Sequence, residues 1–417
     1  MTRTRFASTL ALLAGLACSA GAQPASEISL IRTIQPDDAA MVRPSPIRPE
    51  RPVVQLAILL DTSGSMSGLI EQAKTQLWSI VNELALTERH GVTPVLEVAL
   101  YEYGKSSLSA EEGWVRQILP LTRDLDAVSA ELFQLQTNGG DEYCGWVIQD
   151  ASRELAWNDS GDSLKMIVIA GNEPFTQGEV DYKSSVPEAI ARGIIVNTIF
   201  CGSAEEGINT GWADGAKLGD GEYTSIDHNA AVPHIDAPQD DELSRLSTEL
   251  NTTYLAYGDE GEEARMRQTA QDANAAGAAP AVAAERAQTK ASTLYSNTRW
   301  DLVDAIREGV VKLGELKDED LPAPMRDMSI EEQREYVEQA AGRRAEIQAR
   351  IKELSAARAN YIAAERAKIS GATTLGEALL GAIRDQASRV GLEKPAEEAP
   401  VESETGASSA AAENEGG

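Results

Sequence analysis

One apolar stretch followed at once by a polar loop constrains this chain more than any other feature. Residues 53–60 are nearly all apolar, which is typical of a central parallel strand covered by helices on both faces. Asp61 follows at the carboxyl end of that strand, the edge at which open α/β sheets bind ligands. Asp61, Ser63 and Ser65 alternate, so one carboxylate and two hydroxyls can point into one pocket. Gly64 permits the tight backbone path. These oxygen donors predict a site for a hard divalent cation.

The pattern Asp-x-Ser-x-Ser after an apolar strand resembles the metal ion-dependent adhesion site of von Willebrand factor type A domains. The alternation of expected strands and helices over residues 53–258 predicts an α/β fold, a doubly wound and mostly parallel sheet with helices on both faces. The resemblance covers about the same residues. It implies a non-enzymatic domain that binds a protein partner through the metal. The segments 138–145 and 250–254 also resemble a bacterial exported subgroup of this family.

Asp61 has two other interpretations. Asp61 and Ser63 could simply cap the following helix, expected over residues 67–86, but a cap explains one donor and not three in alternation. Asp61 could also be the nucleophile of a phosphotransferase. Haloacid dehalogenase-like enzymes carry a second Asp two positions later, to act as acid and base, and this chain has Ser63 there.

A second loop that the resemblance requires lies at residues 136–142. In the family, a Thr after two glycines supplies a hydroxyl ligand. Here Asp141 follows the two glycines and Thr137 precedes them. We favour Asp141 as the metal-facing residue, with Thr137 as the other candidate. Asp141 could instead cap the helix expected over residues 143–157.

The third loop departs from the family's pattern. The buried strand expected over residues 165–170 usually ends in an Asp that supports the metal through water, and this chain has Gly171. Either the Glu173 side chain reaches back to the metal, or Asp141 in the second loop supplies the negative charge that the third loop lacks. Asp61 and Asp141 together would still neutralise a divalent ion. The departure bears on partner affinity, because a carboxylate bound directly to the metal lowers its attraction for an incoming one.

The donor set predicts Mg²⁺, with Ca²⁺ or Mn²⁺ as alternatives, because carboxylates, hydroxyls and waters suit hard ions. The expected partner is a protein that offers a carboxylate to the metal. A net charge of −29 argues against nucleic acid, which needs clustered Lys and Arg. The three histidines lack ligand spacing and no serine has a hydrolase motif. Two alternatives stay open: a structural cell-envelope protein with a degenerate metal site, and a metal-dependent hydrolase.

The remaining sequence predicts an exported protein of two parts. Residues 1–22 read as a secretory signal peptide, because two arginines precede an apolar core and an Ala-x-Ala-type cleavage site. This places the protein in the periplasm or outside the cell, and Cys18 makes a lipid-anchored form conceivable. No later stretch is long and apolar enough to span a bilayer. The further segments are a linker at 23–52, a flexible connector at 259–284, a helical hairpin or bundle at 285–394 and a disordered acidic tail at 395–417.

The helical region has a helix-start signal and an apolar pattern, and the chain has two cysteines outside the expected signal peptide. Ser329 and Glu332 have the spacing of a capping box that begins a long helix. Its apolar residues 347, 351, 354 and 361 fall near heptad positions, which favours packing within the chain over self-association. Cys144 and Cys201 are expected near neighbouring strand ends, and export implies an oxidising compartment. We therefore predict a disulfide between them, provided that their Cα atoms lie within about 7 Å.

Overall fold

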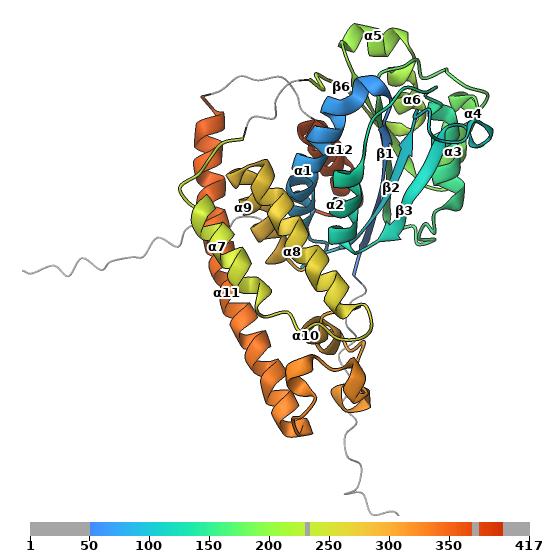
Figure 1. Cartoon of the computed structure of the whole chain (residues 1–417). Helices are drawn as coiled ribbons and strands as arrows, with labels where there is room; N and C mark the ends of the chain where they lie inside the picture. Colours follow the sequence, from blue (N-terminus) through green and yellow to red (C-terminus); the bar gives the residue numbers. More distant parts are fainter. Residues whose placement is uncertain (1–50, 230–233, 369–374, 395–417) are drawn as a thin grey trace, which may run out of the picture. The chain divides into compact units, whose positions relative to one another are not determined.

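The structure is a computed structural model that describes residues 51–229, 234–368 and 375–394 (Figure 1). The predicted signal peptide, almost all of the predicted linker and the predicted acidic tail lie outside these residues. All the described residues belong to one compact unit. Among the described helices, none has the length and apolar character needed to cross a membrane.

Six strands form one sheet: β1 Val53–Asp61, β2 Val95–Tyr103, β3 Val115–Thr122, β4 Leu164–Gly171, β5 Ile195–Cys201 and β6 Asp220–Ile226. Their order is β3-β2-β1-β4-β5-β6, so β1 lies inside the sheet between β2 and β4. These three strands are parallel, as are β5 and β6, whereas β3 pairs antiparallel with β2 at one edge. The predicted mostly parallel α/β sheet is confirmed.

Helices cover both faces of this sheet and continue after it. The α-helices are α1 Ser67–Ala85, α2 Leu125–Gln134, α3 Cys144–Glu154, α4 Tyr182–Ala191, α5 Ala204–Asn209, α6 Trp212–Leu218, α7 Asp240–Asn251, α8 Gly261–Ala278, α9 Pro280–Lys290, α10 Leu302–Arg307, α11 Ile330–Arg366 and α12 Leu375–Arg389. The 3-10 helices are η2 Gly64–Met66, η3 Ala110–Glu112, η4 Leu313–Glu315, η5 Asp318–Asp320 and η6 Ala323–Met325.

The continuous apolar run in β1 follows from burial on both faces. Leu56, Ile58 and Leu60 pack in a core with α1, α2, α7 and α12. Ala57 and Leu59, which point the other way, pack in a second core with α3, α4 and α6. Neither set can be polar, so the strand shows no alternation. This double covering fixes Asp61 at the end of a rigid strand.

The segment predicted as a flexible connector is helical, so that prediction is wrong. Residues 259–284 contain α8 and the start of α9. Alanine has the highest helix propensity, and Pro280 occupies the first turn of α9, where its missing N–H costs no hydrogen bond. Ala275 and Val282 are buried in the core that α1 shares. The exact boundaries of the predicted domains stay predictions.

The long helix begins as predicted. Ser329 and Glu332 form both hydrogen bonds of a capping box at the start of α11. Ile347 and Ile351 are buried in the same core as the sheet, whereas Tyr361 is 37% exposed. The apolar positions near the middle of α11 therefore pack within the chain.

The structure contradicts the predicted disulfide between Cys144 and Cys201. Both side chains are buried free thiols. Cys144 lies in the core on the α3 face of the sheet, where its Sγ is 3.8 Å from Tyr103 Oη, and Cys201 lies in the core on the α1 face. Sharing one end of the sheet was not sufficient, because the two side chains point to opposite faces.

Candidate functional site

Three loops meet at the carboxyl ends of β1, β2 and β4. The first two predicted loops adjoin directly: Asn138 N–H donates to Thr62 O at 3.1 Å. A Cβ added at Gly64 would lie 3.7 Å from Gly139 N. The β2–β3 loop closes the other side, where Ser106 N–H donates to Gly139 O at 2.5 Å. The backbone thus brings the Asp-x-Ser-x-Ser loop and the glycine loop together.

The first loop holds Asp61 in a fully buried position at the end of β1. Its Oδ1 accepts from Ser63 N–H at 2.7 Å, and the Oγ atoms of Ser63 and Ser65 are 3.3 Å apart. Asn172 Nδ2 donates to Ser65 Oγ at 3.3 Å. Asp61 Oδ2 is buried and completes no hydrogen bond with any described residue. The carboxylate and both hydroxyls therefore lie in one small volume, with one acceptor left open.

Burial raises the pKa of Asp61 to about 7. The Ser63 backbone and hydroxyl and the nearby Asn172 amide oppose this shift, and the charge of Glu173 adds to it. A shift of this size means that the ionised carboxylate lacks a compensating positive charge. A divalent cation would supply it.

Glu142, which the sequence interpretation missed, is the second acid at this point. Its residue exposure is only 6%, and burial raises the pKa of its carboxyl to about 8, with further contributions from Asp61 and Glu173. The Ser63 hydroxyl hydrogen bond acts the other way. A Cβ added at Gly104 would lie 2.7 Å from Glu142 Cγ and 3.0 Å from Asp61 Oδ1. The two carboxylates therefore face the same space.

The two second-loop candidates from the sequence occupy other positions. Asp141 is exposed, and Thr137 is half-buried. The charge of Asp141 contributes less to the raised pKa of Glu142 than the charges of Asp61 and Glu173. Two adjacent acids cannot both face inward from an extended loop. Here Glu142 faces inward and Asp141 is exposed. The Asp-Glu pair was the signal in the sequence, and the choice between its members was not readable from it.

The missing acid of the third loop has a steric explanation. A Cβ added at Gly171 would lie 2.5 Å from Tyr103 Oη and 3.1 Å from Asp61 Oδ2. The buried Tyr103 hydroxyl donates to Ala170 O at 3.0 Å and so occupies the space that a side chain at 171 would need. Burial raises the pKa of Tyr103 well above its usual value, so it remains a neutral phenol. Glu173 is half-buried nearby.

The residues present fit a hard divalent cation. Asp61 offers an unused buried oxygen, Glu142 a second carboxylate, and Ser63 and Ser65 offer hydroxyls, which is a donor set of oxygen atoms alone. Within the described residues, no three His, Cys, Asp or Glu side chains are grouped closely enough to hold a metal. A metal here would therefore depend on hydroxyls and waters besides the two carboxylates.

Residues 55–208 match the family model described as von Willebrand factor type A domain. The chain thus contains a von Willebrand factor type A domain, and the sheet described above is its fold. Domains of this class are usually non-catalytic binding domains. No curated protein matches the chain at the sequence level.

Solved structures that are similar to part of this chain include a conserved hypothetical protein BatB from Bacteroides thetaiotaomicron, with 20% identity over 42% of this chain and 90% of that chain and a TM-score of 0.32. An aerotolerance-related membrane protein from Bacteroides fragilis, with multiple mutations to serines, shows 19% identity over 42% and 92%, with a TM-score of 0.29. Proximal thread matrix protein 1 from the mussel byssus, with a zinc occupied MIDAS motif, shows 13% identity over 42% of each chain, with a TM-score of 0.32.

Proposed function

We propose that this von Willebrand factor type A domain binds a protein partner through a divalent cation, expected to be Mg²⁺, with Ca²⁺ or Mn²⁺ as alternatives. The cation lies among Asp61, Ser63, Ser65 and Glu142. The observation that carries the proposal is the buried Asp61 carboxylate: its Oδ2 completes no hydrogen bond with any described residue, and its Oδ1 borders the same space at Gly104 as the Glu142 side chain. Two ionised carboxylates in one buried space repel each other unless a cation lies between them.

The residues have separate tasks in this proposal. Asp61 supplies charge from a rigid strand end, and Ser63 and Ser65 complete the pocket with neutral oxygens. Glu142 supplies the charge that the family's third-loop acid provides elsewhere, and Asp141 and Thr137 lie beside the pocket. Two carboxylates neutralise the cation. The cation therefore attracts a partner carboxylate less strongly than it would in a site with only one carboxylate ligand. We therefore expect partner binding of modest affinity.

Calorimetric titration with Mg²⁺ tests the metal site. Asp61→Asn should abolish binding, and Glu142→Gln should weaken it at least tenfold, because each removes a charge and keeps the shape. Asp141→Asn is the matched neighbour, one residue away and exposed, and should change the affinity by less than about threefold. The reverse order would assign the charge to Asp141, as the sequence suggested. A parent protein that binds none of Mg²⁺, Ca²⁺ or Mn²⁺ at millimolar concentration would contradict the proposal.

One observation favours a second candidate, a structural envelope protein whose site has lost its metal. Tyr103 fills the third-loop position that carries an acid in the family. Co-purification from the cell envelope, with and without a chelator, separates the two. Partner proteins released by chelator support metal-dependent binding, whereas partners that stay bound support the structural role.

Export is part of the proposal, on the basis of residues 1–22. A mature protein should begin near Gln23. N-terminal sequencing of protein from the envelope fraction checks this, and a mature chain that keeps residues 1–22 would contradict it.

A further inference from the structure

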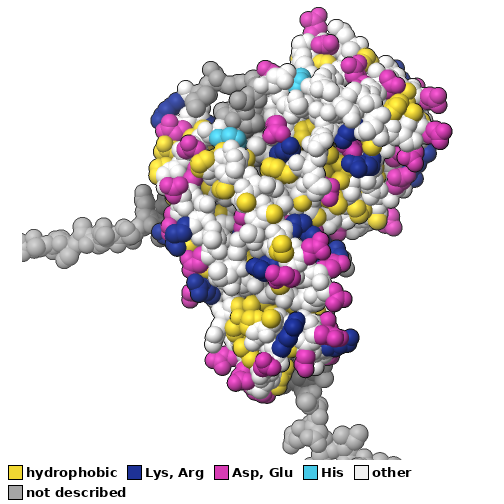
Figure 2. Space-filling view, viewed as in Figure 1, with side chains coloured by type: hydrophobic (Ala, Val, Ile, Leu, Met, Phe, Trp, Pro, Cys, Tyr) yellow, Lys and Arg dark blue, Asp and Glu magenta, His cyan; other side chains and the backbone are white. Residues whose placement is uncertain are grey.

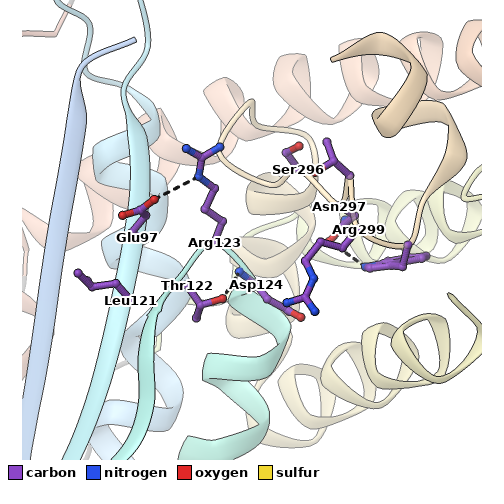
Figure 3. Close-up of a pocket in the computed structure, with 10 residues that line it drawn as sticks. Glu97, Leu121, Thr122, Arg123, Asp124, Ser296, Asn297 and Arg299 are labelled. Atoms are coloured by element: carbon purple, nitrogen blue, oxygen red, sulfur yellow. Dashed lines mark hydrogen bonds and ion pairs between the residues drawn. The ribbon is translucent and has the colours of Figure 1, made fainter. Parts of the chain in front are cut away.

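A cavity of about 270 Å³ lies far from the candidate metal site (Figure 3). Its walls are Glu97 of β2, the end of β3, the start of α2 and the 296–300 loop between α9 and α10. In the sheet, Gln55 pairs with Glu97, whereas Asp61 pairs with Tyr103. The cavity therefore opens about 20 Å from Asp61 along the strands, at their amino ends.

Two arginines, Arg123 and Arg299, are among the residues that line this cavity. Figure 3 shows Arg123 in the turn between β3 and α2, joined to Glu97, and Arg299 in the facing loop. Arg123 Nε is 3.5 Å from Glu97 Oε1, and Arg299 Nη2 is 3.3 Å from Glu260 Oε2. Their side chains are 56% and 76% exposed. A guanidinium has five N–H donors, so a single ion pair leaves donors for a ligand.

The acids in the wall are already engaged. Glu97 Oε2 accepts from Gln55 Nε2 at 2.7 Å. Asp124 caps α2 by accepting from Ala127 N–H at 2.9 Å, and its other oxygen is 2.6 Å from Arg267 Nη2. An anion that enters the cavity thus meets carboxylates whose charge is partly neutralised.

Arg51 is a further arginine that interacts electrostatically with Arg123. Arg51 donates to Thr93 O and to Pro94 O. Burial lowers the pKa of Arg51, the charge of Glu308 opposes this shift, and the charges of Arg123 and Arg307 lower the pKa further. Acidic side chains are spread over the face that Figure 2 shows.

The loop that carries Arg299 is held firmly by its neighbours. Trp300 stacks on Tyr254 with ring centroids 5.6 Å apart, and Tyr257 Oη donates to Thr298 O at 2.6 Å. Asn297 Oδ1 accepts from the Trp300 indole N–H at 3.2 Å, whereas Asn297 Nδ2 is buried with no acceptor among the described residues. The cavity wall is thus formed before any ligand arrives and contains one donor without an acceptor.

We propose that this cavity is a binding site for a small organic anion whose carboxylate groups pair with Arg123 and Arg299. The volume is just below the range of about 300–1,000 Å³ found for small-molecule pockets, so the ligand is a short dicarboxylate and not a nucleotide. Planar carboxylates match the fork of N–H donors on a guanidinium. Glu97 and Glu260 keep their pairs, because each arginine has donors to spare.

Glutarate titrated into the full chain, in buffer without divalent cations, tests the site independently of the metal. Calorimetry gives the affinity, and the Trp300 indole N–H signal of protein labelled with ¹⁵N-tryptophan reports the place, with Trp300→Phe to assign it. Arg123→Gln and Arg299→Gln should each weaken glutarate binding about tenfold or more, because each removes charge-assisted hydrogen bonds. Arg350→Gln is the matched control, since it removes a half-exposed arginine of α11 that forms an ion pair with Glu353 and does not line the cavity.

Support requires saturable binding that shifts the Trp300 signal and is lost in both cavity variants but not in the control. Three outcomes would overturn the proposal. These are no saturable binding of glutarate, equal binding by the cavity variants, and equal binding of the neutral diamide glutaramide. Tighter binding of inorganic phosphate than of glutarate would overturn the carboxylate assignment in favour of a phosphate group.

Discussion

The buried arginine of α9 offers the sharpest test of how the helical region is attached to the sheet. Arg286 is 1% exposed and its Nη1 lies 2.6 Å from Asp126 Oδ1 of α2. Its Nε lies 2.9 Å from Asp272 Oδ1 of α8, and its guanidinium is 4.4 Å from the Trp78 ring centroid of α1. One side chain therefore joins two helices of the sheet domain to two helices that follow it.

Arg286→Ala should lower the free energy of unfolding by about 3–5 kcal/mol, the range for removing one partner of a buried ion pair. Asp126 would keep only the Tyr295 hydroxyl, at 2.6 Å, as compensation for its buried charge. Arg245→Ala is the control. Its side chain is 59% exposed and pairs with Glu242 and Glu249, so the expected loss is below about 1 kcal/mol.

Urea unfolding followed by circular dichroism measures both values, and the two variants should keep the parent spectrum in the absence of urea. Similar small losses for both variants would refute the reasoning, because Arg286 would then not be buried between charged partners. Two separate unfolding transitions in the parent would refute it in another way, since the helices and the sheet would then unfold independently.

Three further predictions concern single sites. Burial raises the pKa of Glu285 from its usual 4.5 to about 7, so its stabilising contribution is complete below pH 4.5 and is lost as the pH rises through 7. The gain in free energy of unfolding of Glu285→Gln over the parent should therefore be larger at pH 8 than at pH 5. We expect the difference, measured by urea unfolding, to be about 1–2 kcal/mol, because the side chain is 23% exposed and solvent reduces the effect. Gly171→Asp should destabilise by about 1–3 kcal/mol through overlap with Tyr103, and the added change Tyr103→Phe should recover part of this loss; full additivity of the two changes would contradict the overlap. Cys144 and Cys201 should both react with a thiol reagent after denaturation without reductant, and two unreactive cysteines would restore the predicted disulfide.

The fold was predictable because its signals are local and repeated. The apolar run of β1 needs both faces of the strand covered, and that requirement alone favours a parallel sheet between helices. The capping box at Ser329 likewise depends on residues three apart. The prediction of a flexible connector is wrong because it takes Ala-rich composition as a sign of flexibility. Alanine forms helices readily, and Pro280 begins one.

The candidate site was predictable only where one strand fixes its geometry. Asp61 follows β1 directly, so its place at the strand end required no knowledge of other segments. Glu142 and Tyr103 differ, because their positions depend on contacts between loops. Glu142 lies beside Asp61 because Gly104, at a φ of +79°, leaves that space open, and Tyr103 occupies the space above Gly171. The third loop lacks its acid because Tyr103, which lies 68 residues before Gly171 in the chain, blocks the position. Tyr103 belongs to no motif, so nothing in the sequence indicated this. An acid missing from one loop is therefore explained by the side chain that fills its space, and under the proposed function Glu142 supplies the charge in its place.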